Sequence, residues 1–328
     1  MKTPPLADIL TTLHVVRIPM RVKFRGITTR DAALFEGPEG WTEFSPFPEY
    51  DDAEAATWLR AAVDWGWIAQ PETLRDRVAV NATVPAVAAD EVAAVLARFD
   101  GCAAVKVKVA EAGQSLDADL ARLRAVRAAL PDAALRVDAN GAWSVAEAVT
   151  ALTAFAPFGL QYAEQPVASV AELAAVREQL RDRGVSVPIA ADESVRKASD
   201  PLRVARAGAA DVIIVKAQPL GGVSRALEVV QAAGLPAVVS SALDTSVGIA
   251  LGAHLAAALP EELSGGASGL GTVNLFHDDV ATRSLVPHRG EIPVGRPEVS
   301  EQKLTELAAP DEVFRWWRER IIRCHALL

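Results

Sequence analysis

The stretch AAVKVKVA, residues 103–110, sets the architecture of this chain. In it Val105, Val107 and Val109 alternate with Lys106 and Lys108, and alternation with a period of two predicts a β-strand. On such a strand the lysines share one face and the valines share the other, so two ammonium groups point the same way about 7 Å apart. The strand therefore needs one apolar neighbour and one polar surface that accepts two positive charges.

Similar β-branched runs recur along the chain from Val78, separated by amphipathic segments rich in Ala, Leu and Arg. The runs are RVAVNAT, AAVKVKV, ALRVDAN, LQYAEQ, VPIAADES, ADVIIVKA, PAVVSSA and GLGTVNLF. A repeat of roughly 25–30 residues suits a strand–helix unit, and about eight such strands predict a parallel barrel or an open doubly wound sheet. The barrel is favoured because the chain contains no GxGxxG or Walker-type phosphate-binding loop.

The composition argues against several classes of protein. The chain has 328 residues, 51% of them hydrophobic, which is enough for a large core. A formal net charge of −9 argues against binding to nucleic acid or to anionic membranes. Cys102 and Cys324 give neither a disulfide framework nor a metal-ligand spacing. The N-terminus is interrupted by polar residues and prolines and predicts no signal peptide, so we expect a soluble cytoplasmic protein.

Ionisable and polar residues stand at the carboxyl ends of the predicted strands, where barrel chemistry collects. In chain order they are Lys106 and Lys108, Asp138 and Asn140, Glu164, Asp192, Lys216, and Ser240 with Ser241. The ionisable positions from Lys108 onward are 24 to 30 residues apart, which is one strand–helix unit each. Any one of them is also explained as a helix cap or a solvated loop charge, but the joint pattern predicts a site.

The residue types indicate the chemistry of that site. Asp138, Glu164 and Asp192 supply oxygen ligands without a nearby His or Cys, which suits Mg²⁺ or Mn²⁺ better than Zn²⁺. Arginine carries most of the positive charge of this chain, so lysines retained at strand ends indicate proton transfer, because only lysine can lose its proton at useful pH. A divalent cation opposite lysines suits removal of a proton alpha to a carboxylate.

We assign Lys108 as the base in this hypothesis. Free lysine titrates near 10.4, so a base working near neutrality needs a lowered pKa, and a neighbouring ammonium such as that of Lys106 lowers it. Lys216 would face the other side of the substrate as an electrostatic partner or a second acid/base. The chain has no GxSxG elbow, and no histidine lies at an identified strand end, so a serine nucleophile or a histidine base has no support.

The same motifs resemble the enolase superfamily and its muconate-lactonizing-enzyme-like subgroup. They are the KxK strand, DAN, EQP, DES and the lysine in VKAQPLGG. The resemblance covers nearly the whole chain. It implies an α/β fold with a modified (β/α)₇β TIM-type barrel over residues 78–289. It also implies an α+β capping domain over residues 1–77, on which residues 290–328 pack back. Segments 17–30 and 41–52 are our candidates for the lid over the site.

Within that subgroup the chain resembles the o-succinylbenzoate synthases of actinobacterial type. WTEFSPFPEY, VAVNATVPA, SSALDTSVGIALGAHLAAALP and GLGTVNLFHDDV carry this resemblance, although Thr42 stands where that family usually has Gly. It implies dehydration of 2-succinyl-6-hydroxy-2,4-cyclohexadiene-1-carboxylate to 2-succinylbenzoate in menaquinone biosynthesis. It further implies that Asp138, Glu164 and Asp192 bind Mg²⁺, which holds the ring carboxylate, and that Lys108 moves the proton while Lys216 covers the opposite face. Near the rest of this small-molecule carboxylate substrate we expect Asn140, Ser240, Ser241 and the turn Gly269–Gly271.

Three alternatives stay open at this point. The first is an N-succinylamino acid racemase or dipeptide epimerase that uses Lys108 and Lys216 on opposite faces. Pro219 and the lack of an acidic DxD in GLGTVNLFHDD disfavour it. The second is a non-catalytic metabolite-binding barrel. The third is an interaction module built on Trp58, Trp65 and Trp67, which are more simply explained as buried between capping domain and barrel. The sequence does not define an oligomeric state.

Overall fold

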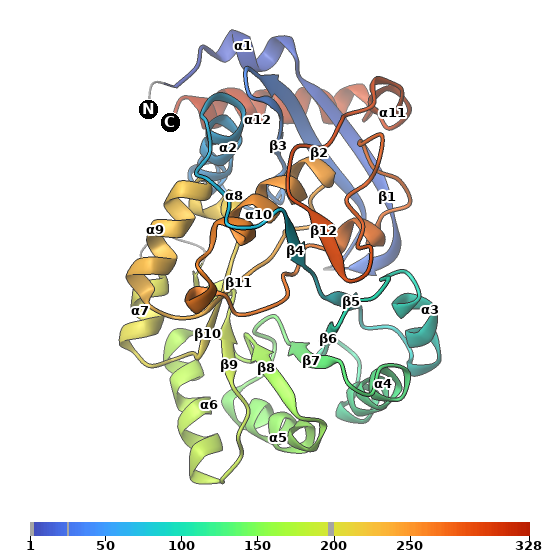
Figure 1. The fold of residues 1–328 in the computed structure, drawn as a ribbon, viewed down its shortest axis with the longest axis vertical. Coiled ribbons are helices and arrows are strands. Elements are labelled where there is room, and N and C mark those ends of the chain that lie inside the picture. Colours follow the sequence, from blue (N-terminus) through green and yellow to red (C-terminus); the bar gives the residue numbers. More distant parts are fainter. Residues whose placement is uncertain (1–2, 25, 196–199) are drawn as a thin grey trace.

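A computed structural model of the chain describes residues 3–24, 26–195 and 200–328. An antiparallel sheet in the order β1–β2–β3 lies at one end of the molecule and a parallel α/β body at the other (Figure 1). The antiparallel sheet consists of β1 (His14–Phe24), β2 (Ile27–Gly37) and β3 (Gly40–Phe44). Among the described residues, no helix is both long enough and apolar enough to cross a membrane.

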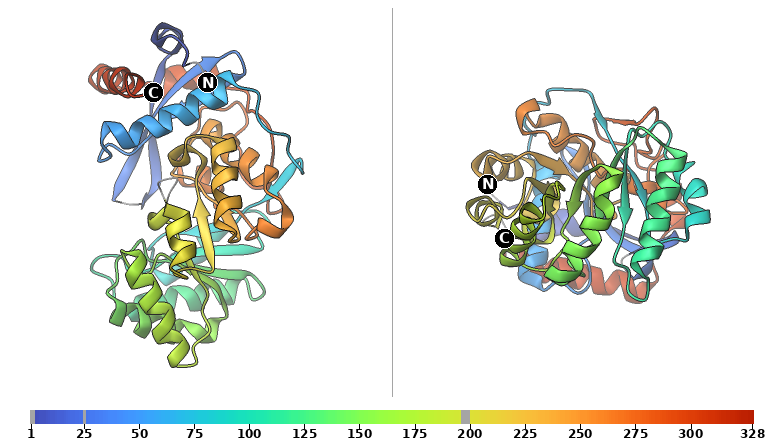
Figure 2. Two further views of the ribbon diagram at one scale, coloured as in Figure 1. Left: turned by 90° about the vertical axis from the view of Figure 1, so that its left-hand side faces the viewer. Right: turned by 90° about the horizontal axis from the view of Figure 1, so that it is seen from below.

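The C-terminal helix α12 (Asp311–His325) packs on this first sheet together with α2 (Asp52–Trp67), and α1 (Leu6–Thr11) lies beside them. Trp317 of α12 is buried edge-on against Phe44 of β3, with ring centroids 5.7 Å apart. His325 bonds to the carbonyl of Pro4, so the two ends of the chain lie close together in both figures (Figures 1 and 2). The chain thus completes its N-terminal layer with its last helix.

The parallel sheet contains seven strands, each paired with its neighbour in chain order. They are β5 (Ala82–Val84), β6 (Ala104–Lys108), β7 (Ala134–Asp138), β8 (Leu160–Glu164), β9 (Ile189–Ala191), β10 (Val212–Val215) and β11 (Ala237–Val239). The helices between them are α3 (Val92–Leu96), α4 (Leu116–Ala129), α5 (Val145–Phe155), α6 (Val170–Asp182), α7 (Asp200–Arg206), α8 (Ala217–Leu220) and α9 (Val223–Ala233), and α10 (Ser246–Ala258) follows β11. Seen from below, this sheet curls and the helices lie outside it (Figure 2). The predicted barrel architecture is confirmed.

Two of the eight predicted strands differ from the expectation. The first run splits into β4 (Arg77–Ala79), which pairs antiparallel with β12 (Glu291–Pro293), and β5. The last run, GLGTVNLF, forms no strand, and its residues Thr272–Leu275 form a 3-10 turn. The barrel is closed there by two residues instead. Ser268 exchanges backbone hydrogen bonds with Ala79 and Asn81, and the Gly269 amide donates to Val239.

A glycine is needed at this closure because the segment passes so close to β11. A Cβ at Gly269 would lie 2.6 Å from the Ser240 hydroxyl oxygen. Below it, the fully buried Arg136 of β7 donates to the Asn81 side chain at 3.0 Å and to the Ala267 carbonyl at 2.6 Å. Its guanidinium also lies 4.9 Å from the Tyr162 ring centroid inside the barrel. One side chain therefore links three parts of the barrel where a regular eighth strand is missing.

The tryptophan-rich helix α2 packs between the two bodies. It contacts α8, and Trp65 packs edge-on against His254 of α10 at 5.4 Å between ring centroids. Trp58 and Trp65 are buried and Trp67 is half-buried, so this helix offers little apolar surface to a partner protein. The simpler explanation of these tryptophans therefore fits the structure.

Glu43 of β3 connects the first sheet to the barrel. It is buried, and its carboxylate accepts hydrogen bonds from the Thr245 amide at 3.0 Å, the Thr245 hydroxyl at 2.6 Å and the Gly248 amide at 3.0 Å. These donors lie at the start of α10, where amide groups lack partners within the helix. Burial and the nearby carboxylate of Asp244 raise the pKa of Glu43 to about 7, whereas the Arg30 guanidinium opposes this shift.

The raised pKa predicts a pH-dependent stability. The folded chain binds the Glu43 proton more tightly than the unfolded chain does, so this group's contribution to the free energy of unfolding is lost as pH rises from about 4.5 to about 7. Glutamine at position 43 cannot ionise. We therefore expect the Tm of the wild type to fall relative to that of Glu43→Gln between about pH 5 and about pH 8. A Tm difference that is constant over this range would contradict the assignment.

Candidate active site

The carboxyl ends of the parallel strands bring the predicted site residues together around one small cavity of about 40 Å³. Its lining includes Lys106, Lys108, Asp138, Asn140, Asp192, Lys216, Ser240, Ser241 and Gly269, together with Phe24, Thr83, Ala242, Leu243 and Thr272. Glu164 lies buried beside it, bonded to Lys106. All ten site residues predicted from the sequence are therefore found at one end of the barrel.

Strand register explains why these side chains converge. Lys108 of β6 pairs in register with Asp138 of β7, and Asp138 pairs with Glu164 of β8. Residues in register on neighbouring parallel strands point to the same face of the sheet, which here is the barrel interior. Lys106 points to the same face two residues earlier, while Val105 and Val107 are buried in the main apolar core. The alternation in AAVKVKVA therefore places the lysines toward the cavity and the valines in the apolar core, as predicted.

The three lysines and three carboxylates form an ion-pair network. Lys106 Nζ lies 2.8 and 3.0 Å from the two oxygens of Glu164 and 3.2 Å from Asp138 Oδ2. Lys108 Nζ donates to the same Asp138 oxygen at 2.5 Å and to Asn140 Oδ1 at 2.6 Å. Lys216 Nζ, which lines the cavity from the end of β10, pairs with Asp192.

Burial and neighbouring charges shift these groups in different directions. Burial alone would raise the pKa of Asp138 and of Asp192, but their lysine partners lower both below the ordinary range. Burial and the facing Asp138 carboxylate raise the pKa of Glu164 to about 8. Burial would lower the pKa of Lys106, yet Glu164 and Asp138 hold it well above its ordinary value. The carboxylates are thus crowded enough to require positive charge between them.

Four residues just after strand ends have left-handed backbone conformations without being glycine. They are Ala110, Asn140, Gln165 and Leu243, with φ between 37° and 63°. Such conformations are sparsely populated and cluster at functional sites. They follow β6, β7, β8 and β11, the strands that carry most of the site.

Gln165 is a site-supporting residue that the sequence reasoning did not assign. It is fully buried, and its side-chain oxygen accepts from the backbone amides of Asp192 at 3.0 Å and Ser194 at 3.2 Å. Its amide group donates to the Val167 carbonyl at 2.8 Å. It therefore fixes the end of β9 relative to β8. Gln165 belongs to the EQP motif, but the motif alone gave no reason to assign it a role.

The four residues expected near the rest of the substrate are already hydrogen-bonded or closely packed. The Ser241 hydroxyl donates to the Gly269 carbonyl at 3.0 Å and lies 2.8 Å from the Thr272 hydroxyl. Gly269 packs against Ser240 at the barrel closure. Asn140 accepts from Lys108 and donates to Glu193 at 3.1 Å. Their common location is as expected, while contact with substrate stays a prediction.

A larger hollow of about 390 Å³ adjoins this cavity and shares Phe24, Lys108 and Asn140 with it. The Lys108 ammonium lies 5.1 Å from the centroid of the Phe24 ring, which belongs to β1 of the first sheet. Pro85–Ala88, which follow β5, also line the hollow. Phe24 was not singled out from the sequence, although it falls in the segment 17–30 expected to cover the site.

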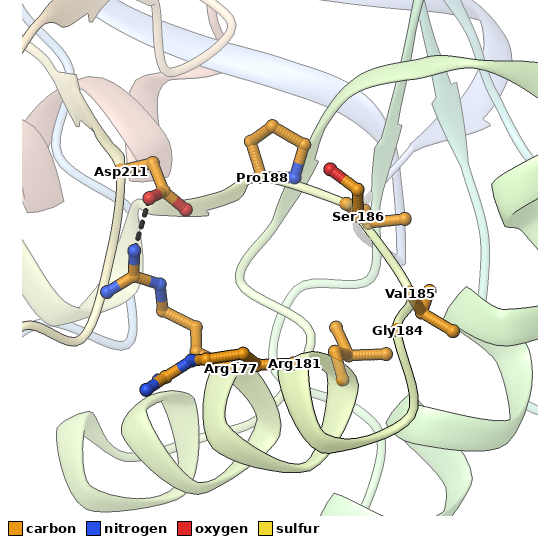
Figure 3. Close-up of a pocket in the computed structure, with 9 residues that line it drawn as sticks. Arg177, Arg181, Gly184, Val185, Ser186, Pro188 and Asp211 are labelled. Atoms are coloured by element: carbon orange, nitrogen blue, oxygen red, sulfur yellow. Dashed lines mark hydrogen bonds and ion pairs between the residues drawn. The ribbon is translucent and has the colours of Figure 1, made fainter.

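Another hollow, of about 420 Å³, lies at the opposite rim of the barrel (Figure 3). It is lined by the end of α6, by residues 184–188 before β9 and by Asp211 before β10. Arg177 pairs there with Asp211 and with the Gly208 carbonyl. Because it lies at the amino ends of the strands, it is separate from the convergent lysines and carboxylates.

The carboxylates fit a divalent cation by their chemistry. Asp138 and Glu164 converge on a single ammonium, that of Lys106, so a positively charged atom already lies within bonding reach of both. Asp192, on the next strand, interacts electrostatically with the same ammonium. In the part of the chain that the structure describes, no three His, Cys, Asp or Glu side chains are already arranged to hold a metal ion. Buried carboxylate oxygens without soft ligands suit Mg²⁺ or Mn²⁺.

Residues 88–298 match the Enolase C-terminal domain-like family, and residues 15–66 match the Enolase N-terminal domain-like family. The o-succinylbenzoate synthase of Mycolicibacterium smegmatis is 54% identical over 326 residues, covering 99% of this chain and 98% of the relative. The chain belongs to the o-succinylbenzoate synthase family of the enolase superfamily. Family members from Mycobacterium tuberculosis and Mycobacterium marinum are 53% and 51% identical, covering 99% and 98% of this chain and 97% and 96% of those relatives. The resemblance inferred from the motifs is confirmed, and so is its assignment to an enzyme family.

Solved structures of more distant relatives share the fold. The muconate lactonizing enzyme from Pseudomonas fluorescens superposes with a TM-score of 0.75 at 18% identity, covering 91% of this chain and 98% of that one. The 2-chloromuconate cycloisomerase from Rhodococcus opacus gives a TM-score of 0.73 at 23% identity over 91% and 98% of the two chains. The L-Ala-D/L-Glu epimerase from Bacillus subtilis gives 0.73 at 21% identity over 88% and 96%. At these identities the comparisons support the architecture alone.

Proposed function

We propose that this chain dehydrates 2-succinyl-6-hydroxy-2,4-cyclohexadiene-1-carboxylate to 2-succinylbenzoate, the step its family supplies to menaquinone biosynthesis. The observation that carries the proposal is the identity of more than half of the residues with o-succinylbenzoate synthases over nearly the whole chain. The convergence of three lysines and three carboxylates around one cavity supports it independently. The reaction is a syn β-elimination that removes a ring proton and a hydroxyl group as water.

Lys108 is the proposed base. It abstracts the proton alpha to the ring carboxylate and returns it to the departing hydroxyl on the same face, so one residue serves both halves of the elimination. Its contacts with Asp138 and Asn140 hold the ammonium at the cavity surface. Lys106, two residues earlier on the same face, is the like charge proposed to disfavour protonation of Lys108 during the reaction. Lys216 approaches from β10 and would lie over the opposite face of the intermediate, where a cation–π contact with the forming ring is favourable.

Mg²⁺ is the proposed cofactor, with Mn²⁺ as an alternative, and Asp138, Glu164 and Asp192 would hold it. When bound, it would supply positive charge beside the substrate carboxylate as that group takes up the charge of an enediolate. The same carboxylates now bond to Lys106, Lys108 and Lys216, so a cation and the ammonium groups compete for them. The competition favours lysines that are less tightly paired with these carboxylates in the loaded enzyme.

The alternatives have weaker support. A racemase would also use Lys108 and Lys216 from two sides. However, the epimerases that share the fold are only about one-fifth identical to this chain in sequence. A non-catalytic barrel would not need three lysines facing three carboxylates. An assay for 2-succinylbenzoate, with and without Mg²⁺, tests the proposal beside an assay for N-succinylamino acid racemisation. We expect metal-dependent formation of 2-succinylbenzoate. Racemisation without dehydration would favour the racemase function over the proposed dehydration.

A further inference from the structure

The loop that follows β11, residues 240–245, forms one wall of the candidate active-site cavity. Ser240, Ser241, Ala242 and Leu243 all line it. Leu243 has a φ of 63°, in the left-handed region that a bulky residue rarely adopts. A residue keeps such a conformation only where its surroundings impose it, and this kind of strain concentrates at functional sites. The wall therefore needs something to hold it.

Arg30, on β2 of the first sheet, contacts this wall from outside the barrel. Its Nε donates to the Leu243 carbonyl at 3.1 Å and its Nη2 to the Ala242 carbonyl at 3.2 Å. The guanidinium is buried, bonds to the Ser45 carbonyl and lies 4.4 Å from the Phe47 ring centroid. Arg30 is thus fixed within its own layer while it donates to two consecutive carbonyls of the strained loop.

Glu43 fixes the other end of the same loop. As described above, its carboxylate accepts from the Thr245 amide and hydroxyl and from the Gly248 amide. A Cβ at Gly248 would lie 2.9 Å from Glu43 Oε2, so only glycine permits this approach. Two side chains of the first sheet, Arg30 and Glu43, therefore hold both ends of the segment Ala242–Thr245.

We propose that Arg30 is a positioning residue that holds Ala242 and Leu243 in the conformation that shapes the substrate cavity. The inference rests on the proposed function, because it takes the molecule in that cavity to be its substrate. The described contacts of Arg30 are with Ala242, Leu243, Ser45 and Phe47 and not with the proposed reacting groups. Its effect should therefore fall on substrate binding more than on the chemical step, as a rise in KM with a smaller change in kcat.

The first test replaces Arg30 with methionine, which keeps the length of the side chain and removes its donors. We expect KM to rise about tenfold, because two buried carbonyls lose their partner and the loop can relax. Arg30→Lys retains a charge and fewer donors, so it should give an intermediate KM. Arg75→Met is the matched control. Arg75 donates to the carbonyls of Ala256 and Leu259 at the far end of α10, so its loss should leave KM at the wild-type value.

The decisive test combines Arg30→Met with Leu243→Gly. Glycine adopts a positive φ without strain, so Arg30→Met should raise KM several-fold less in the Leu243→Gly background if Arg30 acts by holding this conformation. Affinity for 2-succinylbenzoate, measured by calorimetry, should follow the same pattern without any turnover. An unchanged affinity and KM in Arg30→Met, or the same fold-change in both backgrounds, would overturn the inference. A wild type that binds 2-succinylbenzoate without forming it would refute the proposed function instead.

Discussion

Alanine in place of Lys108 is expected to lower kcat by at least about 10²–10⁴-fold, the usual contribution of a general base. The Lys108 ammonium lies at the cavity surface, where it donates to Asp138 and Asn140. The two other lysines of the described site are held by other carboxylates. Lys106 lies deeper and is bonded to Glu164, while Lys216 belongs to the far side. Formation of 2-succinylbenzoate at saturating Mg²⁺ measures the effect, and the Tm of the variant shows that it has folded.

Two further variants test whether Lys108 transfers a proton or only supplies a positive charge. Arginine at position 108 keeps a positive charge beside Asp138 but cannot deprotonate, so Lys108→Arg should be as inactive as the alanine variant. Lys303→Ala removes an ammonium that bonds to Asp278 at 2.7 Å on a partly exposed surface, and it should keep the wild-type kcat. Substantial activity in Lys108→Arg would mean that the residue supplies charge only. Near-normal turnover in Lys108→Ala would remove the base from the mechanism.

The location of the candidate site was predictable because its residues obey local rules that the chain repeats. Period-two alternation placed Lys106 and Lys108 on one face, and regular spacing placed Asp138, Glu164, Asp192 and Lys216 at successive strand ends. Each of these signals depends only on backbone geometry within one strand–helix unit. The strand register then brings such positions together without any further information.

The features that the sequence could not predict depend on contacts between distant segments. The run GLGTVNLF looks like a strand, yet its residues form a turn, because Gly269 passes close against Ser240 while Ser268 bonds to the other barrel edge. Arg30 and the carbonyls of Ala242 and Leu243 are more than 200 residues apart in the chain. A side chain that bonds to backbone carbonyls of a distant loop leaves no periodic signal, since any residue type presents the same carbonyl.

The second large effect is expected from Glu164→Gln, which replaces one carboxyl oxygen by an amide nitrogen with almost no change of shape. The two oxygens of Glu164 share the Lys106 ammonium with Asp138, which makes Glu164 one side of the point on which the carboxylates converge. We expect the Kd for Mg²⁺ to rise at least about 10²-fold, since even changes outside the ligand shell cost 10–100-fold in metal affinity. Calorimetric titration with Mg²⁺ measures this without any turnover.

Glu193→Gln is the comparison that gives this result its meaning. Glu193 adjoins Asp192 and is half-buried, but it accepts a hydrogen bond from the Asn140 amide instead of sharing Lys106. Its loss should therefore change the Kd for Mg²⁺ by less than about tenfold, through long-range charge alone. If both variants weakened Mg²⁺ binding equally, the affinity would depend on the total charge of the cavity and not on a defined ligand. If Glu164→Gln bound Mg²⁺ as tightly as the wild type, the proposed ligand set would be wrong. The lysines would then remain the principal cations that the three carboxylates hold.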